Sequence, residues 1–156
     1  MRGKILIVED YAYWRELLSG MLMREGHEVQ TAASLQQARA LIRGNKDLDL
    51  AILDIRLVET DESNEDGMQL LADIHRAQGF TRVIMISGHG TMEKQRKAFR
   101  EFRAFDFFRK EQFNSEEFRR GVQEAVEEAA RERSRSKDSE YIQSRRFEQW
   151  RRGTEP

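Results

Sequence analysis

The feature that most restricts the fold of this chain is a set of three apolar runs separated by segments of helical periodicity. The runs lie at residues 4–8, 48–55 and 82–87. Their nearly continuous apolar character is typical of strands buried on both faces of a parallel sheet, because a half-exposed strand would alternate apolar and polar residues. Two further short strands are expected at residues 28–32 and 104–109.

The segments between these strands carry apolar residues at the spacing of a helix that packs on one side. Helices are expected at residues 11–25, 34–44, 66–78 and 91–102 and from residue 115 onward. Ser34 suits an N-cap, and Gly26 and Gly44 mark the ends of two helices. Strands that alternate with helices predict an α/β domain, in which helices cover both faces of a five-stranded parallel sheet.

Polar residues stand where the expected strands end. The first strand ends in Glu9 and Asp10, the third in Asp54, the fourth in Ser87, and Lys110 follows the fifth. Ligands of open parallel sheets bind beyond the carboxyl ends of the strands. We therefore expect these five side chains to meet at one edge of the sheet.

This set of side chains indicates phosphoryl chemistry on a carboxylate. Neighbouring carboxylates repel one another unless a proton or a divalent cation neutralises them, and a site of oxygen ligands favours Mg²⁺. A lysine and a serine would supply a positive charge and a hydrogen-bond donor for an anion. With a nucleophilic aspartate, these are the groups that phosphoryl transfer to a carboxylate requires.

Composition excludes several other kinds of site. The chain has no cysteine, which rules out disulfides and thiolate metal sites, and its three histidines lack the spacing of metal ligands. The formal net charge of −1 gives no general attraction to nucleic acid or membranes. No apolar segment approaches the roughly 20 residues that a membrane span needs, so we expect a cytoplasmic protein without membrane insertion.

Four separated motifs resemble the receiver domain of bacterial two-component response regulators, the CheY-like family. They are Ile-Leu-Ile-Val-Glu-Asp (5–10), Leu-Ala-Ile-Leu-Asp (50–54), Ile-Ser-Gly-His-Gly (86–90) and Ala-Phe-Asp-Phe-Phe-Arg-Lys (104–110). Their order is that of the family. The resemblance covers about residues 1–130 and implies a flavodoxin-like sheet with strand order 2-1-3-4-5.

The resemblance implies a phosphoacceptor and a metal site. Asp54 matches the aspartate that takes the phosphoryl group from a histidine kinase or a phosphotransfer protein. Glu9, Asp10 and Asp54, together with the backbone carbonyl of Arg56, match the groups that hold Mg²⁺.

The resemblance also implies a switch. Ser87 matches the hydroxyl that bonds a phosphoryl oxygen, and Lys110 matches the lysine that pairs with the phosphoryl group. Phe107 matches the aromatic side chain that turns inward when the hydroxyl moves. The face formed by the fourth helix, fifth strand and fifth helix would then change shape and alter contacts with a downstream protein or a second copy.

Two segments depart from the family pattern. Lys110 is followed by Glu111, where the family usually has a proline after a cis peptide bond, and a cis bond without proline costs about 3–4 kcal/mol. The connection after Asp54 is longer than usual and carries the acidic segment 59–66. It is either an acidic loop in which Ser63 or Asn64 caps the next helix, or an element that tunes metal affinity, phosphate lifetime or partner choice.

Residues 131–156 continue beyond the expected receiver and contain eight basic and five acidic residues. They are too few for a folded DNA-binding domain. Three readings are open: a helix that packs on the receiver or on a second copy, a segment that becomes ordered on a partner, or a disordered basic tail. Ile142, Phe147 and Trp150 would share one sector of a helix, which favours protein contact over nucleic acid.

The sequence therefore predicts a single-domain response regulator that signals through protein contacts. Such a protein is no enzyme beyond catalysing its own phosphorylation and dephosphorylation. The alternative is a receiver-like binding module that acts without phosphate. A hydrolase or a flavin-binding protein on the same fold is disfavoured, because no second catalytic base is evident and the first loop is acidic.

Overall fold

The computed structural model describes residues 1–57, 64–88, 92–101 and 103–151. Its strands are β1 (Lys4–Val8), β2 (Glu28–Ala32), β3 (Leu50–Asp54), β4 (Arg82–Ser87) and β5 (Asp106–Arg109). Its helices are α1 (Ala12–Arg24), α2 (Leu35–Gly44), α3 (Asp66–Ala77), α4 (Met92–Arg100), the short 3₁₀ turn η1 (Lys110–Gln112) and α5 (Ser115–Arg151).

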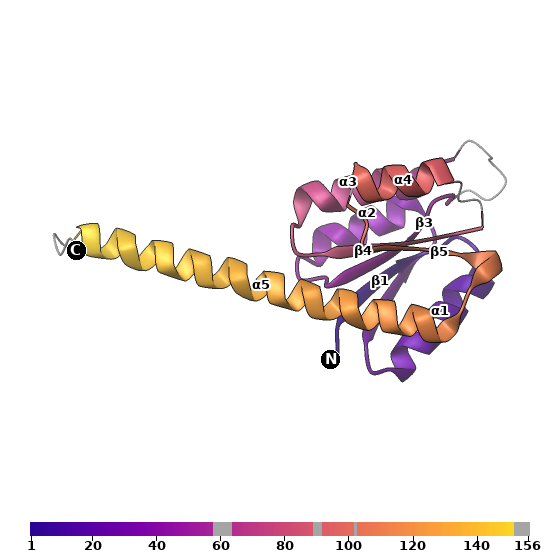
Figure 1. The fold of residues 1–156 in the computed structure, drawn as a ribbon, viewed down its shortest axis with the longest axis horizontal. Helices are drawn as coiled ribbons and strands as arrows, with labels where there is room; N and C mark the ends of the chain where they lie inside the picture. Colours follow the sequence, from indigo (N-terminus) through magenta and orange to yellow (C-terminus); the bar gives the residue numbers. More distant parts are fainter. Residues whose placement is uncertain (58–63, 89–91, 102, 152–156) are drawn as a thin grey trace.

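The strands form one parallel sheet in the order β2-β1-β3-β4-β5, which confirms the predicted topology. Helices α1 and α5 cover one face, and α2, α3 and α4 cover the other (Figure 1). Alternate residues of each strand point to opposite faces. In β3, Ile52 therefore packs toward α1 and α5, while Leu53 packs toward α2, α3 and α4.

Two strands are shorter than predicted. The run at 48–55 forms a strand only over Leu50–Asp54, and Leu48 is buried just outside it. The run at 104–109 forms a strand only from Asp106, which pairs with Ile84. In both cases the flanking apolar residues are part of the core but not of the strand. An apolar run shows that residues are buried, but it does not show where the strand begins or ends.

The predicted helix ends agree with the structure. The Ser34 hydroxyl accepts a hydrogen bond from the backbone N–H of Gln37 at 3.2 Å, which caps α2. Gly26 has φ = +90°, in the left-handed region that suits glycine, and its N–H donates to the carbonyl of Met23 at the end of α1. Among the described residues, no helix combines the length and the apolar character needed to cross a membrane.

Gly67, at the start of α3, sets how closely this helix approaches the end of β3. Its N–H donates to the carbonyl of Ile55 at 2.9 Å. A Cβ atom at this position would lie 1.9 Å from the Asp54 carbonyl oxygen and 2.7 Å from the Ile55 Cα. Because these are backbone atoms, only a shift of the helix or of the strand end could make room.

We expect Gly67→Ala to lower the free energy of unfolding by about 1–3 kcal/mol, the usual cost of an overpacked site. Urea denaturation measures this change. Gly20→Ala in α1 is the matched control, because its added Cβ would have only the Arg24 guanidinium nearby, at 4.0 Å. That control should be unchanged or stabilised by up to about 1 kcal/mol, and equal stability of all three proteins would contradict the tight packing of α3 on β3.

Candidate functional site

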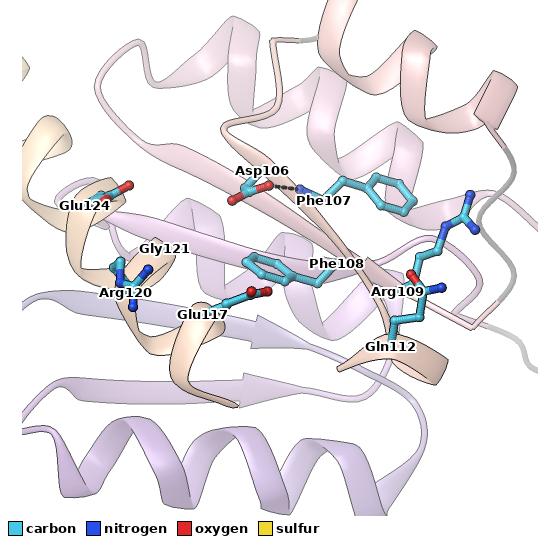
Figure 2. A pocket seen from close by; sticks show the side chains of 9 residues that line it. All are labelled: Asp106, Phe107, Phe108, Arg109, Gln112, Glu117, Arg120, Gly121 and Glu124. Atoms are coloured by element: carbon cyan, nitrogen blue, oxygen red, sulfur yellow. Dashed lines mark hydrogen bonds between the residues drawn. The ribbon is translucent and has the colours of Figure 1, made fainter. Parts of the chain in front are cut away.

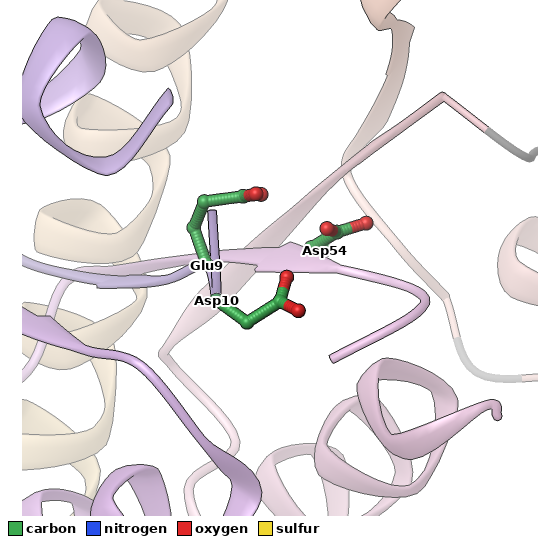
Figure 3. A group of neighbouring side chains, drawn as sticks. All are labelled: Glu9, Asp10 and Asp54. Atoms are coloured by element: carbon green, nitrogen blue, oxygen red, sulfur yellow. The ribbon is translucent and has the colours of Figure 1, made fainter. Parts of the chain in front are cut away.

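Three carboxylates meet at the carboxyl edge of the sheet. Glu9 and Asp10 follow β1, and Asp54 is the last residue of β3. Each offers one oxygen, and the three oxygens lie within 4.8 Å of one another (Figure 3). Glu9 and Asp54 are almost fully buried, with 0% and 1% of their surface exposed, while Asp10 is half-buried.

Lys110 approaches the same cluster from the residue after β5. Its Nζ lies 2.9 Å from Glu9 Oε1 and 3.3 Å from Asp54 Oδ2. The lysine side chain is only 12% exposed. The structure thus brings the adjacent pair Glu9 and Asp10 together with Asp54 and Lys110, which lie far away in the sequence, as the strand-end argument predicts.

The buried charges shift one another's protonation equilibria. Burial, followed by the negative charge of Asp54, raises the pKa of Glu9 to about 8. Burial also raises the pKa of Asp54, although Lys110 opposes this shift. Burial alone would lower the pKa of Lys110, but its attraction to Asp54 and Glu9 and its hydrogen bonds to both raise it above 10.5. One lysine does not balance three carboxylates, so the cluster favours a proton or a cation.

The donor set fits a hard divalent cation. All candidate side-chain ligands are carboxylate oxygens, the type that Mg²⁺ prefers. Glu9 Oε1 already accepts hydrogen bonds from Lys110 and from the N–H of Tyr11, whereas its buried Oε2 has no hydrogen-bond partner in the described part of the chain. The N–H of Arg56 lies 3.4 Å from Asp54 Oδ1, which fixes the segment whose carbonyl is the predicted fourth ligand.

The two predicted switch residues lie on one face of the sheet. Ser87, the last residue of β4, is fully buried, and Met85 and Ser87 point to the same face because they are two residues apart. Phe107 pairs with Met85 across β4 and β5 and is 8% exposed in the core beneath α3 and α4. The register therefore places Phe107 diagonally across from Ser87 on the α4 side, and it places Ser87 one residue beyond Ile86, which pairs with Asp54.

The structure resolves the peptide geometry after Lys110. Every peptide bond of the described residues is trans, including the one between Lys110 and Glu111. Residues Lys110–Gln112 form the η1 turn, in which the N–H of Phe113 donates to the Lys110 carbonyl at 3.3 Å. The lysine thus reaches the cluster without a proline or a cis bond after it.

Only the end of the acidic segment 59–66 can be placed, because residues 58–63, Ser63 among them, lie outside the described residues. The Asn64 side-chain oxygen accepts hydrogen bonds from the N–H groups of Leu57 and Asp66, each at 3.1 Å. The predicted cap by Asn64 is not formed, because the N-cap of α3 is Glu65, which makes no side-chain cap; Asn64 lies one residue earlier and bonds the N–H of the first helical residue. It also ties this helix to the chain that leaves β3.

Sequence reasoning missed the contact that Trp14, in α1, makes with the site. The Lys110 Nζ lies 5.4 Å from the centre of the Trp14 ring, within the range of a cation–π interaction. Helical spacing predicts that Trp14 faces inward, but it says nothing about which strand end lies opposite. No local signal in the sequence could have found this contact.

A hollow of about 690 Å³ lies between β5 and α5 (Figure 2). The acidic side chains of Asp106, Glu117 and Glu124 line it, together with Arg109 and Arg120. Burial, with smaller contributions from Glu124 and Glu117, raises the pKa of Asp106. The hollow belongs to the face of α4, β5 and α5 that the sequence predicts as a contact surface, and not to the carboxylate cluster.

Comparison with known proteins matches residues 5–123 to the family described as the response regulator receiver domain. The nitrogen assimilation regulatory protein NtrX of Azorhizobium caulinodans is 37% identical over 110 residues, which are 70% of this chain and 23% of that protein. The transcriptional regulatory protein TcrA of Mycobacterium tuberculosis is 34% identical over 89 residues, 57% of this chain and 33% of that protein. The chain therefore spans a third or less of these relatives.

Solved structures agree with the sequence relatives. The receiver domain of NtrX from Brucella abortus is 35% identical, with a TM-score of 0.69 over 79% of this chain and 98% of that one. A CheY-like response regulator receiver domain protein from Methanospirillum hungatei is 26% identical, with a TM-score of 0.73 over 85% of this chain and 99% of that one.

We expect the affinity of the cluster for Mg²⁺ to rise with pH and to level off above about pH 8. Below the Glu9 pKa of about 8, a bound cation must displace a proton, whereas above it the carboxylate is already ionised. With one proton exchanged, affinity should fall roughly tenfold per pH unit below that point. Isothermal titration calorimetry in buffers of different ionisation enthalpy counts the released protons.

The controls are two substitutions that remove one charge each. Glu9→Gln cannot take up the proton, so its remaining affinity should lose most of the pH dependence. Asp47→Asn, which changes an exposed aspartate paired with Lys4, should behave as the wild type. Cation binding without proton release at about pH 6–7 would contradict the raised pKa.

Proposed function

The chain belongs to the response regulator receiver domain family of two-component systems, and we propose that Asp54 accepts a phosphoryl group from a histidine kinase or a phosphotransfer protein. The proposal includes signalling by the phosphorylated chain through contacts with other proteins. The observation that carries it is the position of the Lys110 ammonium between Glu9 and Asp54, beside a third carboxylate, at the carboxyl edge of the sheet.

The transfer follows from the groups at this edge. A carboxylate oxygen of Asp54 attacks the phosphorus of the donor, and the bond between phosphorus and the donor nitrogen breaks as the new P–O bond forms. Lys110 lies 3.3 Å from Asp54 Oδ2, where its charge offsets the negative charge that the acceptor gains. Mg²⁺ held by Glu9, Asp10, Asp54 and the Arg56 carbonyl would neutralise phosphoryl oxygens.

In this proposal the chain itself accepts the phosphoryl group and later releases it. Asp54 is a substrate of this reaction as well as its nucleophile, so the chain at most catalyses its own phosphorylation and dephosphorylation. The alternative function, a binding module that acts without phosphate, needs neither the buried lysine nor the carboxylate cluster. A cluster of buried carboxylates is costly to maintain unless it has a ligand, which favours the first function.

The path to a partner would begin at Ser87. Its hydroxyl would donate a hydrogen bond to the phosphoryl group, and Phe107 would move into the space that Ser87 leaves on the α4 side of the sheet. Phe107 also borders the acidic hollow between β5 and α5, so its movement would change that surface. Phosphorylation would thus add charge at one point and shift the balance between two packing arrangements of Ser87 and Phe107.

The division into a receiver at 1–130 and an extension at 131–156 is also part of the proposal. In the structure, α5 continues through residue 130 as one helix to Arg151 (Figure 1). Arg133 ties it to the sheet by donating to the Asp49 carboxylate and, at 2.9 Å, to the Asp47 carbonyl. Its guanidinium also stacks 4.7 Å from the centre of the Phe80 ring.

Beyond this anchor the helix carries large apolar side chains that its own receiver does not cover. Tyr141, Ile142, Phe147 and Trp150 are 51–64% exposed. The segment 141–151 is helical, which differs from the reading of a disordered tail and from a helix packed on its own receiver. An apolar helix surface of this kind supports contact with a protein, either a downstream target or a second copy.

We expect a small phospho-donor with Mg²⁺ to add one phosphoryl group to the wild type and none to Asp54→Asn, because the amide is not a nucleophile. Intact-protein mass spectrometry checks this result. Asp47→Asn, an exposed aspartate at the opposite edge of the sheet, should be phosphorylated as the wild type is. Full labelling of Asp54→Asn, or none of the wild type, would overturn the proposed function.

We expect Phe147→Ala/Trp150→Ala to abolish any increase in molar mass that phosphorylation causes, because the variant removes the two contacting rings near the end of α5. Light scattering coupled to size exclusion measures the mass with and without phospho-donor. Arg145→Ala/Gln149→Ala, on the same helical segment, is the matched control. A wild type that stays monomeric when phosphorylated would exclude self-association. The apolar side chains at the end of α5 would then contact a different protein.

A further inference from the structure

Lys110 is held at the site mainly by groups that the proposed reaction itself uses. Lysine has a long and flexible side chain, and its ammonium has no fixed geometry of its own. Two of its contacts are the ion pairs with Glu9 and Asp54. Glu9 is a proposed cation ligand, and Asp54 becomes the phosphoryl carrier. When these carboxylates engage a cation and a phosphoryl group, both ion pairs are replaced by others, whereas a third contact that the reaction does not change would keep the ammonium near the same place.

The face of Trp14 is that third contact. The Lys110 Nζ lies 5.4 Å from the ring centre, and the lysine is only 12% exposed, so the ammonium is largely shielded from water there. Cation–π contacts are stronger when the cation is desolvated. Unlike a carboxylate, the indole carries no net charge. It can therefore restrain the ammonium without neutralising the charge that a phosphoryl group would need.

The Trp14 ring packs against other aromatic rings. Phe113 meets it edge to face, with ring centres 5.3 Å apart and planes at 82°. Phe113 in turn contacts Phe118, which is fully buried on α5, at 5.3 Å. Rings this close prefer such tilted and edge-on arrangements, which adds to the burial energy. Trp14 is thus braced against α5 through two phenylalanines.

The η1 turn connects this brace to the lysine backbone. It begins at Lys110 and ends just before Phe113, whose N–H donates to the Lys110 carbonyl. The turn therefore sets the distance between the lysine and the ring that supports Trp14. The Lys110 backbone is thus bonded to Phe113 and its ammonium contacts Trp14, and these two residues are in ring contact with each other.

We propose that Trp14, braced by Phe113, is a positioning residue that keeps the Lys110 ammonium over the carboxylate edge when Glu9 and Asp54 bind other groups. This inference rests on the proposed phosphoacceptor function. It adds a residue that touches neither the phosphoryl group nor the cation and that acts through the lysine.

The first experiment measures the contact in the protein without cation or phospho-donor. The indole ring current should shift the Lys110 ε-methylene proton resonances upfield in the wild type. Trp14→Leu should return them to ordinary lysine positions, while Trp150→Leu, which removes the other tryptophan, should leave them shifted. An unchanged Lys110 resonance in Trp14→Leu would overturn the inference. Urea denaturation of each variant identifies any loss of folding.

The second experiment is a double-mutant cycle on beryllofluoride affinity in the presence of Mg²⁺, measured by calorimetry. We expect Trp14→Leu to weaken binding about three- to tenfold, and Trp14→Phe by less, as suits one partly shielded cation–π contact. In a Lys110→Gln chain, Trp14→Leu should have no further effect. Equal losses in both backgrounds would show a general packing role and overturn the inference.

The two proposals fail in different ways. A wild type that binds no beryllofluoride and accepts no phosphoryl group would remove the proposed function, and the positioning role with it. A wild type that does both, together with a Trp14→Leu variant of unchanged affinity and unchanged Lys110 resonances, would remove the positioning role alone.

Discussion

The site depends on a buried excess of negative charge, because three carboxylates face one lysine ammonium. Glu9, Asp10 and Asp54 lie within hydrogen-bonding or coordinating distance of a common point, and Lys110 ion-pairs with both Glu9 and Asp54. A carboxylate out of water is unstable unless it is paired, protonated or coordinated. The sheet brings these groups together because each follows a parallel strand. Glu9 and Asp54 are buried there, and Asp10 is half-buried.

Much of the fold could be predicted from the sequence, because the patterns that encode it are local. Continuous apolar runs indicate strands covered on both faces, and Ser34 and Gly26 mark helix ends through their own hydrogen bonds and backbone conformation. The boundaries that were wrong are at the edges of apolar runs. Leu48 is buried as the strand residues are, so its hydrophobicity carries no information about where β3 begins.

The candidate site also has a part that the sequence could predict and a part that it could not. Glu9, Asp54 and Lys110 could be predicted to converge, because the end of a parallel strand is a position that sequence reveals. The support for Lys110 could not be predicted, since Trp14 lies in α1 and Phe113 follows the η1 turn about 100 residues later, and they meet only in the folded domain. The anchor of Arg133 on Asp49 is of the same kind, because it joins residues 84 positions apart that share no pattern.

The straight course of α5 past that anchor has a mechanical consequence. About 18 residues follow Arg133, and at 1.5 Å per residue they reach roughly 27 Å from the body of the domain. A helix of this kind acts as a lever that pivots at the N-terminal edge of the sheet, and its packed part, Ser115–Arg133, is about as long as its projecting part. A tilt of about ten degrees in the packed part would move the tip by about 5 Å. A shift of the packed part of α5 beside β5 is therefore carried to Trp150 at about the same size and in the opposite direction.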